Sequence, residues 1–228
     1  MGRGRPVTSA SVPPTGEARV VDDVPSAFAD LVVAERPSVI ALSGGGTARR
    51  AYSVLATRAR RPWRDVTVVF GDERWVPVDS DDSNEGMARR VLLDRVGAGA
   101  VRSMREAGAS PEEAAAAYDR LVRELPVLDL VHLGVGDDGH TASLFPGSSA
   151  LEVDDRLVVA TGDDAHPHRR LSFTFPAIAR ARLVVVTVSG PEKASAWALL
   201  CRGEDVPAAR IRAERVVWLV DPAAAGAA

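Results

Sequence analysis

The 228-residue sequence predicts an α/β domain with a mainly parallel sheet and helices on both of its faces. Short apolar runs of strand type alternate with helical stretches along most of the chain, and the connections between them are short. The run 183–186 is wholly apolar, as expected of a parallel strand buried on both faces. We expect a single domain over 20–222, with a disordered lead-in at 1–19 and a flexible tail at 223–228.

The individual elements follow from hydrophobic period and from helix start signals. β-branched and apolar runs predict strands at 20–24, 38–42, 65–70, 101–104, 129–133, 157–161, 170–174, 182–189 and 215–220. Helical patterns predict helices at 25–34, 48–60, 84–93, 111–125, 176–180 and 191–201. The helix at 111–125 has the strongest start signal, because Ser110 is a good N-cap, Pro111 fits the first turn and two acids follow. Ser83 and Asn84 are alternative caps for the helix that ends at 93.

A glycine cluster follows the strand at 38–42 and precedes a helix. Its sequence is Ser43-Gly44-Gly45-Gly46-Thr47. A glycine turn between a strand and a helix presents free backbone N–H groups and a helix N-terminus, an arrangement that binds phosphate. We therefore favour a phosphate-binding turn over a plain flexible loop.

The stretch 129–146 carries the main catalytic candidate. It starts as an apolar strand, breaks into glycines and then presents Asp137, Asp138 and His140. A strand that ends in a glycine-rich turn exposes the side chains at its carboxyl end. His140 is placed there to exchange protons near neutral pH, and Asp138 either orients its ring or caps the turn.

Four polar segments leave strands at what is expected to be one edge of the sheet, where ligands bind in such folds. They are 43–47, 72–74, 138–140 and 190–193, and Arg170 is expected to join them from a later strand. Together they offer backbone amides, Ser43 and Thr47 for a phosphate, with Arg170 and Lys193 as counter-charges. Lys193 is the only lysine among 28 basic residues, which suggests a place where a compact ammonium is needed.

Several motifs resemble the 6-phosphogluconolactonase family, in the same order along roughly residues 20–220. The longest and most specific is Leu133-Gly134-Val135-Gly136-Asp137-Asp138-Gly139-His140-Thr141-Ala142-Ser143-Leu144-Phe145-Pro146. The others are the glycine cluster with Leu42, Gly71-Asp72-Glu73-Arg74-Trp75-Val76-Pro77 with Ser83-Asn84, Arg170-Leu171-Ser172-Phe173-Thr174 and Gly190-Pro191-Glu192-Lys193. The family is similar in fold to glucosamine-6-phosphate deaminase, so the resemblance implies a modified doubly wound, deaminase/ribose-5-phosphate isomerase-like sheet.

The resemblance also implies an activity, the hydrolysis of 6-phospho-D-glucono-1,5-lactone to 6-phospho-D-gluconate. This is the second step of the oxidative pentose phosphate pathway, and neither a metal nor an organic cofactor is expected. It implies that His140, with Asp138 beside it, is the general base and that Arg74 lies near the reacting centre. Phosphate and substrate contacts are expected from Ser43, Gly44, Gly45, Thr47, Asp72, Arg170 and Lys193.

Two departures from the family pattern lie in the glycine cluster. Gly46 and Ala48 stand where the family usually has Ser and Pro. Both changes loosen the turn without removing a charge, so we expect the phosphate site to persist. Arg169 and Arg170 are alternative phosphate ligands, and the spacing to Ser172 and Thr174 favours Arg170.

Two other functions remain open. A sugar-phosphate isomerase or deaminase of the same fold should have an acidic residue shortly after the histidine, where this chain has Ser143-Leu144-Phe145-Pro146. A non-catalytic sugar-phosphate sensor would keep the phosphate-binding turn and would not need His140.

A metal site built from Asp163, Asp164, His166 and His168 is disfavoured, because these residues lack a recognised ligand spacing. His132 alternates into the central strand and is expected to pack.

Composition limits the partners and the compartment. A net charge of -3 gives no reason to expect nucleic acid, and no apolar run is long enough to span a bilayer. The single cysteine, Cys201, excludes an intrachain disulfide and fits the cytoplasm. Residues 1–19 lack the apolar region of a secretory signal. We expect a monomer, with a homodimer as the alternative, and a small-molecule substrate.

Overall fold

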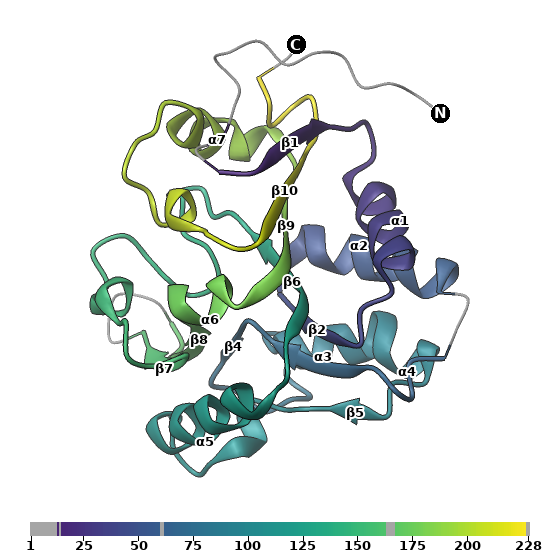
Figure 1. Cartoon of the computed structure of the whole chain (residues 1–228), viewed down its shortest axis with the longest axis vertical. Helices are drawn as coiled ribbons and strands as arrows, with labels where there is room; N and C mark the ends of the chain where they lie inside the picture. The colour runs from purple at the N-terminus through teal and green to yellow at the C-terminus, as the bar shows by residue number, and fades with distance from the viewer. Residues whose placement is uncertain (1–12, 14, 60–61, 163–166, 227–228) are drawn as a thin grey trace.

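A computed structural model describes residues 13, 15–59, 62–162 and 167–226. The large sheet has seven parallel strands in the order β1-β10-β9-β6-β2-β3-β5 (Figure 1). These strands are β1 Glu17–Val20, β2 Val39–Leu42, β3 Thr67–Phe70, β5 Ala100–Val101, β6 Leu128–Gly134, β9 Ala181–Val188 and β10 Arg215–Val220. The predicted α/β fold with a mainly parallel sheet is therefore confirmed.

A second, antiparallel sheet has the order β4-β8-β7. Its strands are β4 Asp72–Arg74, β8 Arg170–Phe173 and β7 Val158–Thr161. The sequence predicted β7 and β8 but placed 72–74 in a connection. Because β4 follows β3 after Gly71 alone, the chain leaves the large sheet and enters the small one within one residue.

Helices cover both faces of the large sheet, as predicted. They are α1 Val24–Glu35, α2 Gly45–Arg58, α3 Asn84–Ala88, α4 Asp94–Val96, α5 Pro111–Glu124, α6 Phe175–Ala179 and α7 Ala194–Cys201. One turn of π-helix, Arg89–Leu93, joins α3 to α4. Figure 1 shows α1 and α2 on one side of the sheet, with α5, α6 and the small sheet on the other.

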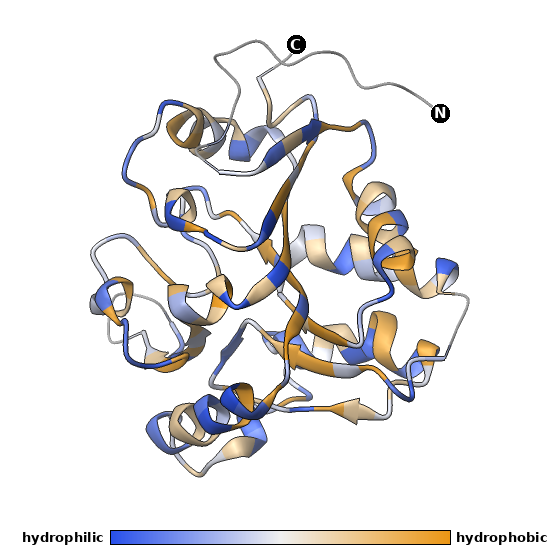
Figure 2. Cartoon of the chain, viewed as in Figure 1, coloured by the Kyte–Doolittle hydropathy of each residue, from blue (hydrophilic) through white to orange (hydrophobic). Residues whose placement is uncertain are grey.

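The core lies between these layers, and the central strands are apolar along most of their length (Figure 2). All four residues of β2 are buried, as are seven of the eight in β9. Burial of this apolar surface provides most of the driving force for folding and fixes the strand ends from which the site is built. Within the described ranges, no helix is long and apolar enough to cross a membrane.

Some element boundaries differ from the predictions. The first strand covers Glu17–Val20 instead of 20–24, because Asp23 caps α1 and Val24 already lies in that helix. Residue 17 thus lies in the sheet, before the expected domain start at 20. Ala224, in the expected tail, is fully buried. The start of α5 is as predicted, with the Ser110 hydroxyl accepting a hydrogen bond from the Glu113 N–H group.

Asp119 joins α5 to the small sheet. Its carboxylate accepts hydrogen bonds from the N–H groups of Leu157 and Val158, and it pairs with Arg123 at 2.6 Å. Burial raises the pKa of Asp119, but the hydrogen bonds from Arg123 and the two N–H groups outweigh burial and hold that pKa below its ordinary value.

The Asp119→Asn variant is expected to lose about 2 kcal/mol of stability near pH 7, because the carboxylate receives four charge-assisted hydrogen bonds, two of them from Arg123. Because the pKa of Asp119 is lower in the folded state than in the unfolded state, its carboxylate stabilises the fold fully at pH values above the ordinary carboxyl pKa. This stabilisation is lost as the pH falls through the folded-state value. Urea unfolding at about pH 7 and about pH 2, below the ordinary carboxyl pKa, should therefore show a smaller loss of stability on acidification for the variant than for the wild type. Parallel curves for the two proteins would contradict the assignment.

Candidate active site

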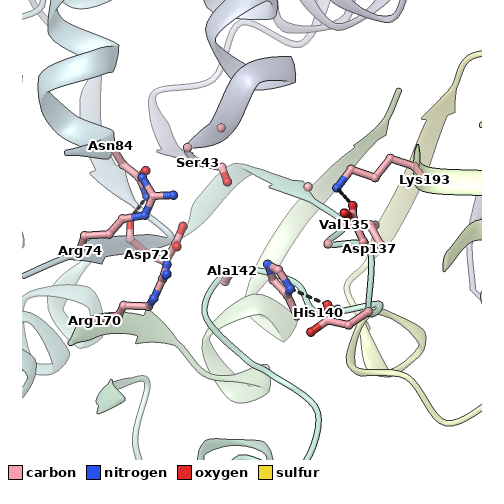
Figure 3. Close-up of a pocket in the computed structure, with 15 residues that line it drawn as sticks. Ser43, Asp72, Arg74, Asn84, Val135, Asp137, His140, Ala142, Arg170 and Lys193 are labelled. Carbon is pink, nitrogen blue, oxygen red and sulfur yellow. Dashed lines mark hydrogen bonds and ion pairs between the residues drawn. The ribbon is translucent and has the colours of Figure 1, made fainter. Parts of the chain in front are cut away.

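A cavity of about 410 Å³ opens at the carboxyl ends of the central parallel strands (Figure 3). The segments that follow β2, β3, β6 and β9 all contribute to it, as the sequence predicted. Its lining residues are Ser43, Gly44, Gly45, Asp72, Arg74, Asn84, Gly134, Val135, Gly136, Asp137, Asp138, His140, Ala142, Arg170 and Lys193.

The glycine turn forms the upper wall of the cavity in Figure 3, where the Ser43 side chain points into the open space. Gly44 is the N-cap of α2 and supplies no side-chain cap, so the first N–H groups of the helix face outward without an intrahelical acceptor. A Cβ atom at Gly44 would lie 1.8 Å from the Asn84 Oδ1 atom, and Gly45 has a φ angle of 91°. Glycine is therefore required at both positions.

Asp72 and Arg74 enter the cavity from β4, because alternate residues of a strand face the same side. Arg170 lies directly opposite Arg74 in the antiparallel pair of β4 and β8. Two like charges placed opposite each other are destabilising. The pair therefore favours an anion in the cavity, where both guanidinium groups are directed (Figure 3).

The carboxylate of Asp72 is fixed from behind. Ser143 donates a hydrogen bond to its Oδ2 atom at 2.8 Å, and the Ser143 N–H group in turn donates to the Ser172 hydroxyl at 3.1 Å. Asn84 donates to the main-chain oxygen of Asp72 at 2.9 Å. These contacts hold Asp72 at the wall of the cavity with one carboxylate oxygen left for a ligand hydroxyl.

Glu73 faces away from the cavity and accepts four hydrogen bonds. Its Oε1 atom accepts from the N–H groups of Arg74 and Asn84, both at 2.8 Å. Its Oε2 atom accepts from the Ser83 hydroxyl at 2.9 Å and the Glu85 N–H group at 2.8 Å. Burial raises the pKa of Glu73, and the four hydrogen bonds oppose that rise. Glu73 thereby joins β4 to the start of α3 and places Arg74 and Asn84 beside each other.

His140 lies at the end of a tight turn after β6. The turn is closed by the Gly136 N–H group, which donates to the His140 main-chain oxygen at 2.8 Å. A Cβ atom at Gly136 would lie 2.0 Å from the His140 ring, so a side chain there would displace the histidine. The ring packs against Phe145 with centroids 4.4 Å apart and projects into the cavity (Figure 3).

Asp138 both caps the turn and orients the ring, so the two alternatives left open by the sequence are combined. Its Oδ1 atom accepts from the His140 N–H group at 3.0 Å and contacts the ring Nδ1 atom at 2.6 Å. Burial raises the pKa of Asp138, but hydrogen bonds and the charge of His140 outweigh it and lower that pKa overall. The ionised carboxylate therefore holds the ring proton on Nδ1 and leaves the Nε2 lone pair available.

Lys193 reaches the cavity from the opposite side to the two arginines (Figure 3). It ends the short 3-10 helix Pro191–Lys193, and Gly190 before it has a φ angle of 107°. Its ammonium group pairs with the exposed Asp137 carboxylate. An anionic ligand at Lys193 therefore competes with Asp137.

Nine of the ten candidate site residues line this cavity: Ser43, Gly44, Gly45, Asp72, Arg74, Asp138, His140, Arg170 and Lys193. Thr47 is the exception. It lies in the first turn of α2, where its hydroxyl accepts a hydrogen bond from Arg50 at 3.3 Å. Arg170 lines the cavity, as the spacing favoured, whereas the Arg169 guanidinium pairs with Glu112.

The sequence did not single out Asn84, Asp137 or Ala142 as lining residues. Successive side chains of a strand point to opposite sides, so in 72–74 Asp72 and Arg74 face the cavity and Glu73 faces away from it. This alternation is the sequence signal that distinguishes Glu73 from the two cavity-lining residues beside it. Ala142 has a φ angle of 49°, an uncommon conformation for a residue with a Cβ atom, and no sequence signal indicates it.

The disfavoured metal site falls largely outside the described residues, which omit 163–166. His168 is described, and its Nε2 atom lies 3.2 Å from Asp82. Among the described side chains, no group of three or more His, Cys, Asp or Glu residues is placed to hold a metal ion.

Known proteins resemble this chain over most of its length. Its sequence is 42% identical over 205 residues to a 6-phosphogluconolactonase of Synechocystis sp., covering 83% of this chain and 84% of that protein. It is 38% identical over 213 residues to a 6-phosphogluconolactonase of Mycobacterium tuberculosis, covering 85% and 86% of the two chains.

Solved structures agree with the sequence comparison. A 6-phosphogluconolactonase of Thermotoga maritima superimposes with a TM-score of 0.75 at 29% identity, covering 90% of this chain and 98% of that one. A monomeric glucosamine-6-phosphate deaminase has a TM-score of 0.80 at 20% identity, covering 93% and 100%, which shows a shared fold. The family model described as glucosamine-6-phosphate isomerases/6-phosphogluconolactonase matches residues 16–218. The chain therefore belongs to the glucosamine-6-phosphate isomerase/6-phosphogluconolactonase family.

Proposed function

We propose that the protein hydrolyses 6-phospho-D-glucono-1,5-lactone to 6-phospho-D-gluconate. The observation that carries this proposal is the Asp138–His140 pair, which presents a free imidazole nitrogen in a cavity flanked by three cationic side chains. The named activity of relatives at 38–42% identity supports the same substrate.

In the proposed mechanism His140 acts as a general base. Its Nε2 atom removes a proton from water as the water oxygen attacks the lactone carbonyl carbon, and Asp138 keeps the opposite ring proton on Nδ1. The bond between the carbonyl carbon and the ring oxygen then breaks, and the proton passes from Nε2 to that oxygen. A lactone is an activated ester, so a positioned base suffices without a covalent nucleophile.

Charge develops on the carbonyl oxygen during the attack. We assign Arg74 to this oxyanion, because its guanidinium lines the cavity near Asp72 and its backbone is fixed by Glu73. Asp72 is then placed to accept a hydrogen bond from a substrate hydroxyl.

The phosphate is assigned to the glycine turn. Ser43, the N–H groups at the start of α2, Arg170 and Lys193 all provide donors or positive charge in the cavity, with Arg170 and Lys193 on opposite sides of it (Figure 3). We assign the main-chain N–H group of Thr47 to the phosphate, because the Thr47 hydroxyl accepts a hydrogen bond from Arg50.

The deaminase alternative lacks its acidic residue. The position is occupied by 143–146, in which Ser143 supports Asp72 and Phe145 packs on the His140 ring. We therefore favour lactone hydrolysis. We also propose a cytoplasmic enzyme that acts as a monomer, since residues of a single chain suffice to line the cavity.

The proposal is tested by comparing three substrates with purified wild-type protein. 6-Phosphogluconolactone should be hydrolysed with a kcat/KM at least about 10²-fold above that of glucono-1,5-lactone, because several charge-assisted hydrogen bonds to the phosphate are lost in the latter. Glucosamine 6-phosphate should release no ammonia. Ammonia release would support the deaminase, and binding of 6-phosphogluconate without turnover of any substrate would support a sensor.

A further inference from the structure

A chain of buried hydrogen bonds runs from the glycine turn into the centre of the large sheet. The Ser43 N–H group donates to the Tyr52 hydroxyl at 2.7 Å, and that hydroxyl lies 2.7 Å from the His132 Nδ1 atom. His132 Nε2 lies 3.0 Å from the Thr187 hydroxyl, which in turn approaches the Leu133 main-chain oxygen at 3.5 Å. These hydrogen bonds thus join the end of β2 to α2, β6 and β9.

The donors in this chain have one consistent order. Because Tyr52 accepts from Ser43, its own proton is directed to His132 Nδ1, and the ring proton on Nε2 is directed to Thr187. Both rings are fully buried, and burial lowers the pKa of His132 to about 3, so the imidazole is neutral. A neutral ring accepts the Tyr52 proton at Nδ1, whereas an imidazolium carries protons on both nitrogens and could not accept it.

His132 therefore does more than pack in the core. Its ring contacts Phe28 with centroids 4.1 Å apart and meets Tyr52 edge-on at 5.3 Å, so the two polar rings are held from several sides. Since these side chains come from a strand and a helix of the core, their hydroxyl and nitrogen atoms have little freedom to move. They form a rigid support directly beneath Ser43.

The glycine turn needs such a support. Three consecutive glycines, 44–46, have no side chains to hold them and lose the most backbone freedom on ordering. Two outside contacts restrain the turn: Tyr52 holds the Ser43 N–H group from below, and Asn84 packs against the Gly44 Cα atom. With its N–H directed inward, Ser43 directs its hydroxyl into the cavity (Figure 3).

We propose that Tyr52 and His132 are positioning residues, which set the Ser43–Gly45 turn in the geometry that binds the substrate phosphate. This inference rests on the proposed function, in which that turn binds phosphate. Neither side chain lines the cavity, so both act through Ser43 and contact no substrate atom.

The test compares Tyr52→Phe with a matched control, Tyr118→Phe. Tyr118 is also fully buried, and its hydroxyl also accepts a strand-end N–H group, that of Phe70 at 3.0 Å, while donating to the Arg102 main-chain oxygen at 2.9 Å. Both variants therefore remove one buried hydroxyl with two partners, and both should lower Tm by about 2–4 °C. Only Tyr52→Phe loosens the glycine turn.

Tyr52→Phe is expected to raise the KM for 6-phosphogluconolactone and the Kd for 6-phosphogluconate by about fivefold to tenfold, the loss expected for about one hydrogen bond. Its kcat should stay within about twofold of wild type, as should its kcat/KM for unphosphorylated glucono-1,5-lactone. Tyr118→Phe should leave both KM and Kd unchanged. Equal KM effects in the two variants, or an unchanged KM in Tyr52→Phe, would overturn the inference.

A second pair of variants tests Thr187, at the other end of the chain of hydrogen bonds. Thr187→Val removes the acceptor for His132 Nε2 at nearly constant volume, and it should raise KM and Kd in the same direction, whereas Thr187→Ser should restore wild-type values. If Tyr52→Phe fails to fold, the comparison of Thr187→Val with Thr187→Ser becomes the test. Equal KM and Kd values in these two variants would then overturn the inference. Calorimetric Kd values for 6-phosphogluconate separate the two proposals. If the wild type hydrolyses no lactone but Tyr52→Phe binds 6-phosphogluconate more weakly than the wild type does, lactone hydrolysis is rejected and the positioning role of Tyr52 is retained.

Discussion

Replacement of His140 by alanine is expected to lower kcat for lactone hydrolysis by about 10²-fold or more. The variant loses the cavity-lining imidazole that a carboxylate aligns, through the 2.6 Å contact between Nδ1 and Asp138. The KM should change little, because the charged groups assigned to the phosphate remain. Initial rates from lactone generated in situ, with the uncatalysed rate subtracted, measure both constants.

Two controls make this experiment specific. The Kd for 6-phosphogluconate should remain within about threefold of wild type, which shows that the phosphate site is intact. Asp138→Asn keeps the ring but replaces its ionised partner, so it should lower kcat as well, though by less than His140→Ala. A His140→Ala protein that binds product normally and retains wild-type kcat would rule out the general-base role.

Glu73→Ala is expected to have the largest effect on stability. The substitution leaves two buried N–H groups, the partly buried Arg74 N–H group and the buried Ser83 hydroxyl without their shared acceptor. An unsatisfied buried donor costs about 1–3 kcal/mol, and partial access of water to the vacated space reduces the sum, so we expect a loss of about 3 kcal/mol or more. Urea unfolding followed by circular dichroism measures this change.

Glu73→Gln and Glu124→Gln provide the comparison. The glutamine at position 73 turns one donor toward N–H groups that cannot accept it, so it should recover only part of the loss. Glu124 is exposed at the end of α5, and its replacement should stay within about 0.5 kcal/mol of wild type. If Glu73→Ala were as stable as Glu124→Gln, the proposed role of Glu73 in joining β4 to α3 would be wrong.

The parts of the fold that the sequence predicted are those set by local signals. Continuous apolar runs identified β2, β3, β6 and β9, because strands of a covered parallel sheet bury both faces. Ser110 and Pro111 located the start of α5. Because parallel strands bring their carboxyl ends together, the glycine turn, Asp72, His140 and Lys193 could be assigned to one site before any contact was known.

What the sequence did not predict depends on contacts between distant segments. β4 is three residues long and becomes a strand only by pairing with β8, nearly a hundred residues later. The Tyr52–His132 contact joins positions 80 residues apart, and an apolar pattern cannot distinguish a packed histidine from one in a hydrogen-bond chain. The Thr47 side chain could not be assigned either, since helix α2 begins at Gly45 instead of 48 and rotates that hydroxyl toward Arg50.

The most direct test of the central claim is the rate at which purified wild-type protein opens 6-phosphogluconolactone, measured by proton release against a protein-free blank. The blank is essential because this ester also opens unaided. We expect a rate that is proportional to protein concentration, saturates with substrate and is inhibited by 6-phosphogluconate. A rate equal to the blank would contradict the proposed lactone hydrolysis.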